Sequence, residues 1–177
     1  MKMAKKLLAV ALAGVLALSV LTGCGNSTGT KSIADAMNDM LKGRDITVKS
    51  DSDLNAKVKK IVELKDQIES KEPDNEQNKA KTDGVTPTAK TEIMKIMGDA
   101  YNDQFVWIAY APTKGYNTTA QAAELLRLVE SDELVLNAPT DKDKNTIKTY
   151  RIGTTTLTED GDTVRIALIA AEADDAE

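Results

Sequence analysis

The sequence predicts an α+β body in which helices pack on a small, mainly antiparallel sheet that ends in a C-terminal hairpin. Segments with helical apolar spacing alternate with short β-favouring runs along the chain. The run from Phe105 to Ala111 is apolar on both faces, which is typical of a central strand. Residues 146–158 and 163–171 flank the turn sequence Glu159-Asp160-Gly161-Asp162, which favours a hairpin. We expect the helices to cover one face of this sheet.

The N-terminal segment has the pattern of an export signal. Three lysines precede an apolar run at residues 7–21, and no acidic residue occurs before Asp35. A basic start followed by an apolar stretch of about 15 residues is typical of a secretory signal and is short for a membrane-spanning helix. The run ends in Leu21-Thr22-Gly23-Cys24, which resembles the lipobox of bacterial lipoproteins.

The resemblance implies that residues 1–23 are removed and that Cys24 carries the lipid that holds the protein to a membrane. Residues 24–31 then form a flexible tether. The implied location is extracytoplasmic, on the outer face of the cell membrane. Because Gly25 is not aspartate, the resemblance implies the outer membrane if the cell has two membranes. The alternatives are an ordinary signal peptide with a chance cysteine and a short membrane anchor.

The composition excludes several classes of function. Without residues 1–23, which hold three lysines and no acid, the 23 basic side chains fall to 20 against 28 acidic ones, a net charge of −8. This charge disfavours nucleic acid as a partner. The chain has one cysteine and no histidine, so Ser-His-Asp and Cys-His catalysis and ordinary zinc sites are excluded. We expect no cofactor and no metal.

The first half of the mature chain predicts two helices around a short strand. Ser32 and Asp35 have the spacing of a capping box and predict the start of the first helix, which Gly43 ends. The run at residues 46–48 predicts a strand. A second capping signal at residues 50–53 starts a longer helix. The apolar positions of this helix share one face: Leu54, Val58, Ile61, Val62, Leu64 and Ile68.

Residues 32–171 are predicted to form one domain, with two lobes separated by the polar stretch 71–90 as the alternative. Later elements are a helix from Thr88 or Thr91, a helix capped by Asn117 or Thr118, and a strand at residues 134–136. We expect the acidic tail at residues 172–177 to fray.

A candidate ligand site lies at the end of the predicted central strand. Five of the six aromatic residues of the mature chain fall between Tyr101 and Tyr116. Aromatic rings beside amide and lysine donors are typical of a platform for a sugar or a peptidoglycan fragment. The alternative is that Phe105 and Trp107 belong to the core. The candidate ligand-binding residues are Trp107, Tyr110, Lys114, Tyr116 and Asn117.

The acidic residues form no specific motif. Asp141-x-Asp143-x-Asn145 resembles the opening of a calcium loop, but Thr146 stands where such a loop needs glycine and Ile152 where it needs glutamate. An acidic loop between strands is the plainer interpretation. A pair of carboxylates could hydrolyse a glycosidic bond. However, no pair can be nominated among the acids considered: Glu92, Asp99, Asp103 and Glu124.

Together these observations predict a membrane-anchored extracytoplasmic lipoprotein that acts as a non-catalytic binding or interaction module at the cell envelope. Its expected partners are the membrane, through lipid on Cys24, and an envelope protein, a wall polymer or a small ligand. The alternative function is a small carboxylate-dependent enzyme that acts on cell-wall or surface polysaccharide.

Overall fold

The computed structural model describes residues 29–70 and 86–176. The signal segment, Cys24 and residues 71–85 therefore lie outside the described residues. Five strands form one mixed sheet in the order β1-β4-β5-β2-β3. The strands are β1 (Thr47–Ser50), β2 (Phe105–Pro112), β3 (Val135–Asn137), β4 (Thr149–Glu159) and β5 (Asp162–Ala171). The helices are α2 (Thr30–Met40), α3 (Ser52–Glu63), α4 (Lys65–Ser70), α5 (Pro87–Met97) and α6 (Thr118–Ser131), with 3-10 turns η2 (Asp99–Tyr101) and η3 (Lys144–Thr146).

The predicted C-terminal hairpin is confirmed as the centre of the sheet. β4 and β5 pair antiparallel from Tyr150 and Ala171 to Glu159 and Asp162. The two turn residues, Asp160 and Gly161, have φ angles of 51° and 87°, as a type I′ turn requires. β2 pairs antiparallel with β5 along its whole length, and only β1 pairs in parallel, with β4. The α+β class and the mainly antiparallel sheet are therefore confirmed.

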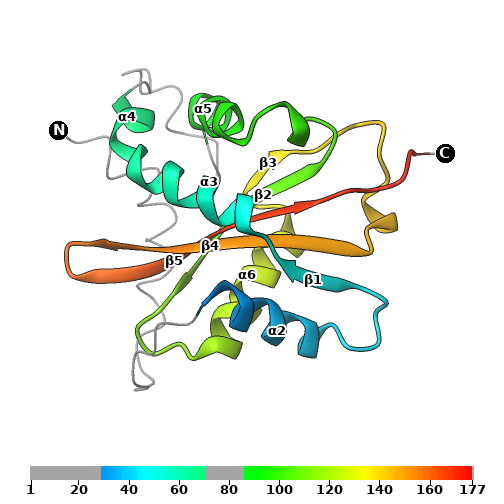
Figure 1. Cartoon of the computed structure of the whole chain (residues 1–177), viewed down its shortest axis with the longest axis horizontal. Coiled ribbons are helices and arrows are strands. Elements are labelled where there is room, and N and C mark those ends of the chain that lie inside the picture. Colours follow the sequence, from blue (N-terminus) through cyan, green and yellow to red (C-terminus); the bar gives the residue numbers. More distant parts are fainter. Residues whose placement is uncertain (1–28, 71–85, 177) are drawn as a thin grey trace.

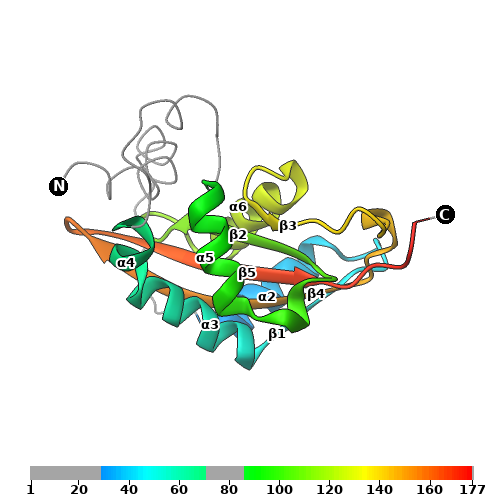
Figure 2. The same cartoon turned by 90° about the horizontal axis from the view of Figure 1, so that it is seen from above.

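Helices cover both faces of the sheet, so the expectation of one covered face is wrong. One apolar cluster joins α2 and α6 to one face, and a second joins α3, α4 and α5 to the other. Figure 1 shows the strands between these two helical layers, and Figure 2 views the molecule from the side of α3 and α5. The physical reason is that β2 and β5 carry apolar side chains on both faces, so each face needs a cover.

Local sequence signals set most helix starts. The carboxylate of Asp51 accepts hydrogen bonds from two backbone N–H groups of the first turn of α3, as its capping signal predicts. α5 begins at Pro87 rather than at Thr88 or Thr91, because Thr86 caps it and proline suits the first helical position. α2 begins at Thr30 without a side-chain cap, so the predicted start at Ser32 is wrong.

The helix α3 crosses β4 at very close range. Gly153 lies in β4 where an added Cβ would collide with the backbone of Leu54 and Asn55. Beyond residue 152, β4 has no partner strand on this side. There the side-chain oxygen of Asn55 accepts the backbone N–H of Thr154 at 2.9 Å, which satisfies an edge donor that the sheet leaves open.

The C-terminal segment, which was expected to fray, makes hydrogen bonds as far as Ala176. The backbone N–H of Asp143 donates to the carbonyl of Asp174 at 2.9 Å, and that of Ala176 donates to Asp141 at 2.8 Å. Lys142 and Asp175 form an isolated bridge and an ion pair. These bonds hold the segment against the loop before β4. None of the helices in residues 29–70 and 86–176 is long and apolar enough to cross a membrane.

Candidate functional site

Trp107 is a core residue, so its prediction as a ligand-binding residue is wrong. Its side chain has no exposed surface and stacks on Phe105, with ring centroids 5.8 Å apart. Its indole N–H donates to Oδ1 of Asp132 at 2.9 Å. The alternative interpretation of Phe105 and Trp107 as core residues therefore holds.

Tyr110 lies in β2 and is partly buried. It alternates along β2 with Ala109 and Ala111, which face α2 and α6. The ring of Tyr110 contacts both apolar clusters. Burial, followed by the negative charges of Glu124 and Glu133, raises its pKa above the ordinary value. These surroundings describe a partly buried edge residue.

The loop that joins β2 to α6 holds the remaining predicted residues. Lys114 is exposed and Tyr116 is partly buried. The backbone N–H of Tyr116 donates to the carbonyl of Thr113 at 3.3 Å, which closes a tight turn. Oδ1 of Asn117 accepts the backbone N–H of Ala120 at 2.8 Å, so Asn117 is the N-cap of α6. Lys114, Tyr116 and Asn117 therefore share the short loop before α6, in which Asn117 is used as the cap.

One amide side chain connects this loop to the sheet beneath it. Gln121, in the first turn of α6, is only 3% exposed. Its Nε2 donates to the carbonyl of Tyr116 at 2.9 Å, and its Oε1 accepts from Nε of Arg165 at 2.7 Å. Sequence reasoning missed both Gln121 and Arg165.

Arg165 is a buried cation in the central strand of the sheet. It is 4% exposed and lies on the face that α2 and α6 cover. Ala167 and Ile169, two and four residues further along β5, point to the same face. Its hydrogen bonds go to Gln121 and to Oγ1 of Thr154, the latter at 3.1 Å. No carboxylate among the described residues forms an ion pair with it. Burial lowers the pKa of Arg165, because desolvation disfavours the charged guanidinium.

A directed series of hydrogen bonds runs from Arg165 to the start of α2. The hydroxyl of Thr30 donates to Oδ1 of Asn55 at 2.7 Å. Since this uses the only hydroxyl proton of Thr30, the hydroxyl of Thr154 must donate to Thr30 across their 2.9 Å contact. Thr154 then has only its lone pairs left for Arg165, and it accepts from Nη1.

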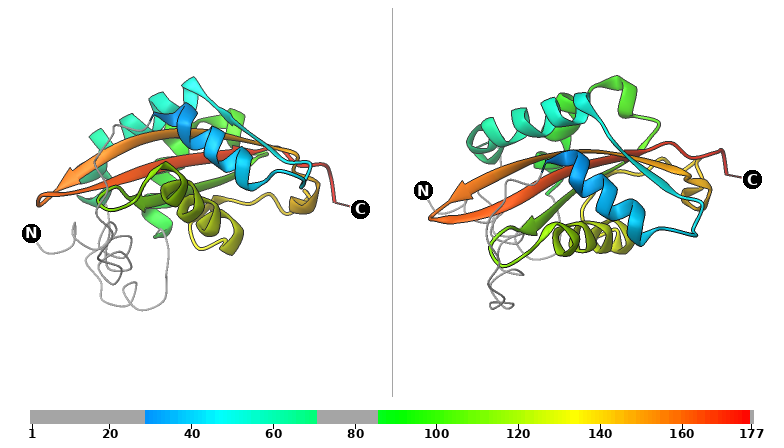
Figure 3. Two further views of the ribbon diagram at one scale, coloured as in Figure 1. Left: turned by 90° about the horizontal axis from the view of Figure 1, so that it is seen from below. Right: turned by 60° about the horizontal axis from the view of Figure 1, so that its bottom comes forward.

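Two helix N-termini meet at this cluster. Thr30 is the first residue of α2, and Gln121 lies in the first turn of α6. Figure 3 shows α2 and α6 together on this face of the sheet, and the two helices contact each other. Neither helix has an acidic residue in its first turn. The positive ends of two helix dipoles therefore add to the charge of the guanidinium.

The sequence does carry a signal for this cluster. Arg165 is the only charged residue in the run Val164–Ala171. A strand with apolar neighbours on both faces buries any charge placed in its middle, and arginine is almost never buried without a partner. An arginine in such a run therefore indicates a specific environment.

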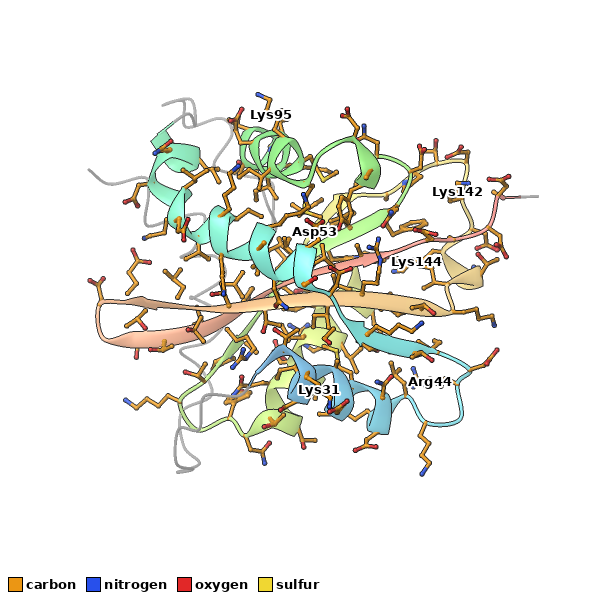
Figure 4. All side chains as sticks on the ribbon, viewed as in Figure 1. Lys31, Arg44, Asp53, Lys95, Lys142 and Lys144 are labelled. Atoms are coloured by element: carbon orange, nitrogen blue, oxygen red, sulfur yellow. The ribbon has the colours of Figure 1, made fainter. Side chains whose placement is uncertain are left out.

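A second polar cluster lies on the opposite face of the sheet, and its arginine, unlike Arg165, has a carboxylate partner. Arg151 of β4 pairs with Asp51 at 3.1 Å and also donates to Gln104. Near it, the hydroxyl of Tyr101 donates to Asp53 at 2.8 Å. Figure 4 shows Asp53 near the start of α3. Here the guanidinium has a carboxylate partner, so the cluster is electrostatically complete.

The acidic residues considered for catalysis or metal binding do not converge. Glu92 pairs with Lys95, and Glu124 pairs with Arg127. Asp143 caps η3 through a 2.9 Å bond to the N–H of Asn145. Within residues 29–70 and 86–176, no group of three or more acids could hold a metal ion.

Comparison with known proteins supplies no relative: no family model, curated protein or solved structure matches the chain.

Proposed function

We propose that the protein is a lipid-anchored, non-catalytic binding module on the extracytoplasmic side of a bacterial membrane. The observation that carries the proposal is the motif Leu21-Thr22-Gly23-Cys24 at the end of an apolar run behind three lysines. The two or three acyl chains of such an anchor bind a membrane far more stably than one chain.

The start of the described fold supports this arrangement. The first helix begins at Thr30, six residues after Cys24. Six residues span at most about 20 Å, so the lipid would hold the start of α2 close to the membrane. The loop at residues 113–117, which Gln121 and Arg165 connect to Thr154 and Thr30, would then lie in the membrane-facing half of the domain.

The partly buried carboxylates support a binding role over a catalytic one. Asp51, which is 17% exposed, caps α3 and pairs with Arg151. Glu124, which is 27% exposed, is held by three hydrogen bonds from Arg127. A glycosidase needs two carboxyl groups that flank one substrate. The partly buried acids named here act in structural pairs instead.

The anchor is tested by replacing its cysteine. Cys24→Ser should abolish incorporation of radiolabelled fatty acid and move the protein from the membrane fraction to the medium or the periplasm. Ser27→Ala, which leaves the lipobox intact, is the matched control and should remain labelled and bound. A Cys24→Ser protein that stays in the membrane after a carbonate wash would show that the apolar segment is the anchor.

The binding role is tested at the loop between β2 and α6. Partners are captured from detergent-solubilised membranes and from wall fragments with the full-length protein, and then with Lys114→Ala and Tyr116→Ala. Both variants should lose the partner while their melting temperatures stay within about 2 °C of wild type, because surface changes cost little. Lys59→Ala changes an exposed lysine on α3 and should keep the partner. Hydrolysis of a wall glycan that one Asp or Glu substitution abolishes would overturn the proposal.

A further inference from the structure

We infer that Arg165, Gln121 and the N-termini of α2 and α6 form a binding site for the oxyanion group of a small anionic ligand, a carboxylate or a phosphate. The inference rests on the proposed binding function and names the chemistry of its ligand. It does not depend on whether Cys24 carries lipid.

The charge balance of the cluster carries the inference. A buried guanidinium without an opposite charge loses its hydration and gains no ion pair in return. Arg165 is in this state: it is 4% exposed, and its hydrogen bonds go to the neutral side chains of Gln121 and Thr154. Two helix N-termini add positive potential at the same place. An anion at this point would be attracted by all three groups.

The donors that remain define the ligand group. A guanidinium has five N–H groups, and the structure engages one on Nε and one on Nη1. Neither N–H of Nη2 has an acceptor among the described residues. The first turn of α2 adds backbone N–H groups that no side chain caps. One N–H of Nη1 also remains, and a donor on Nη1 beside a donor on Nη2 would fit the two oxygens of a carboxylate or a phosphate.

Arg151 shows what the same side chain does when its role is structural. It lies one strand away on the opposite face, where Asp51 supplies a carboxylate at 3.1 Å. Its ion pair joins β4 to the start of α3, and no charge is left to satisfy. Arg165 lacks such a partner, although it is the more deeply buried of the two.

The burial of Arg165 favours a small solute over a polymer or a membrane surface. A flat anionic surface would meet exposed cations, whereas Arg165 lies under α2 and α6. The exposed Lys114 lies in the loop that Gln121 holds, and its charge would attract such a solute to this part of the molecule.

The test uses the full-length protein in neutral detergent, with inorganic phosphate and acetate as the probes. Each anion is titrated at constant ionic strength against chloride, while the melting temperature and the heat of binding are measured. We expect phosphate or acetate, but not chloride, to raise the melting temperature with a saturable dependence. In Arg165→Met, which keeps an unbranched apolar stem but removes the guanidinium, the affinity should fall at least about tenfold.

Two measurements keep the outcome decisive. Arg151→Met removes a paired arginine and should leave the anion response intact. Arg165→Met removes a buried charge but also leaves Oε1 of Gln121 without its donor, so its melting temperature in anion-free buffer is the baseline against which its anion response is measured. The inference is wrong if neither phosphate nor acetate raises the melting temperature more than chloride does. It is also wrong if the protein binds vesicles of phosphatidylglycerol but neither of the two free anions. An equal loss of stability for Arg165→Met in every buffer would assign Arg165 a structural role instead.

Discussion

Gly153 of β4 lies directly beneath the backbone of Leu54 in α3, so close that a methyl group at residue 153 has no room. The atoms that this methyl group would meet belong to the backbone of Leu54 and Asn55 and cannot move without shifting the helix. This contact places Asn55 where it satisfies Thr154 and fixes the hydroxyl of Thr30.

The first prediction concerns this contact. Gly153→Ala should destabilise the protein by about 1–3 kcal/mol or more, because the added carbon forces α3 away from the sheet. The free energy of unfolding in urea measures the effect. Gly29→Ala is the control, since an added Cβ at Gly29 meets nothing within 4 Å. Gly29→Ala should cost no more than about 1 kcal/mol through the weaker N-cap of α2. Equal effects of the two substitutions would contradict the close approach.

The second prediction concerns the buried indole of Trp107. Oδ1 of Asp132 accepts a hydrogen bond from the indole N–H at 2.9 Å and a second one from Nζ of Lys144 at 2.6 Å. Asp132→Ala leaves a fully buried donor without an acceptor and should cost about 1–3 kcal/mol. Because the chain has a single tryptophan, urea unfolding followed by its fluorescence reports directly on this site.

Asp132→Asn is the matched control for that loss. The amide oxygen still accepts the indole N–H, and asparagine tolerates the left-handed backbone at residue 132, where φ is 55°. Only the ion pair with Lys144 is lost, and both partners are partly exposed, at 30% and 48%. We expect a cost below about 1 kcal/mol. An Asp132→Asn variant as unstable as Asp132→Ala would assign the stability to charge rather than to the indole bond.

Much of the fold could be predicted from single segments. Asp160-Gly161 predicts the hairpin because both residues adopt positive φ readily. The helix positions follow from apolar spacing and from caps such as Asp51. The two-sided cover of the sheet could also have been predicted, because a strand that is apolar on both faces, as β2 is, needs a helical layer on each side.

The candidate site was predictable only in part. Lys114, Tyr116 and Asn117 are neighbours in sequence, so their shared loop follows directly. Three elements supply the other residues of the cluster, which are Gln121, Thr154 and Arg165. They meet only because of the register between β4 and β5 and the position in which α6 packs on the sheet. Trp107 was assigned to the ligand site, but it lies in the core. A large ring on a strand that is covered on both faces is buried and cannot reach a ligand.

The third prediction is a loss of stability at high pH. Burial, the hydrogen bond to Asp53 and the negative charge of Asp53 together raise the pKa of Tyr101 to about 12. The unfolded chain releases this proton near the ordinary pKa of about 10. The contribution of Tyr101 is therefore complete below pH 10 and is lost as the pH rises from about 10 to about 12.

We expect the free energy of unfolding to fall across this window and the fall to be smaller in Tyr101→Phe. Asp53→Asn keeps an acceptor for the hydroxyl and removes the charge. It should bring the phenolate absorbance of Tyr101 to a lower pH than in wild type. If Tyr101→Phe loses as much stability as wild type between pH 10 and 12, Tyr101 is not the group responsible.

The last prediction concerns the C-terminal segment, whose order depends on backbone bonds. The N–H groups of Asp143 and Ala176 donate to Asp174 and Asp141, and the N–H of Asp174 donates to Oγ1 of Thr146 at 2.7 Å. Hydrogen exchange of Asp143 should therefore be slowed in the full chain and fast after removal of residues 173–177. Lys142→Ala removes only the ion pair with Asp175, which lies at the exposed surface, and should leave the protection of Asp143 largely intact. Rapid exchange of Asp143 in the full chain would mean that the segment frays in solution and that the charged pair alone cannot hold it.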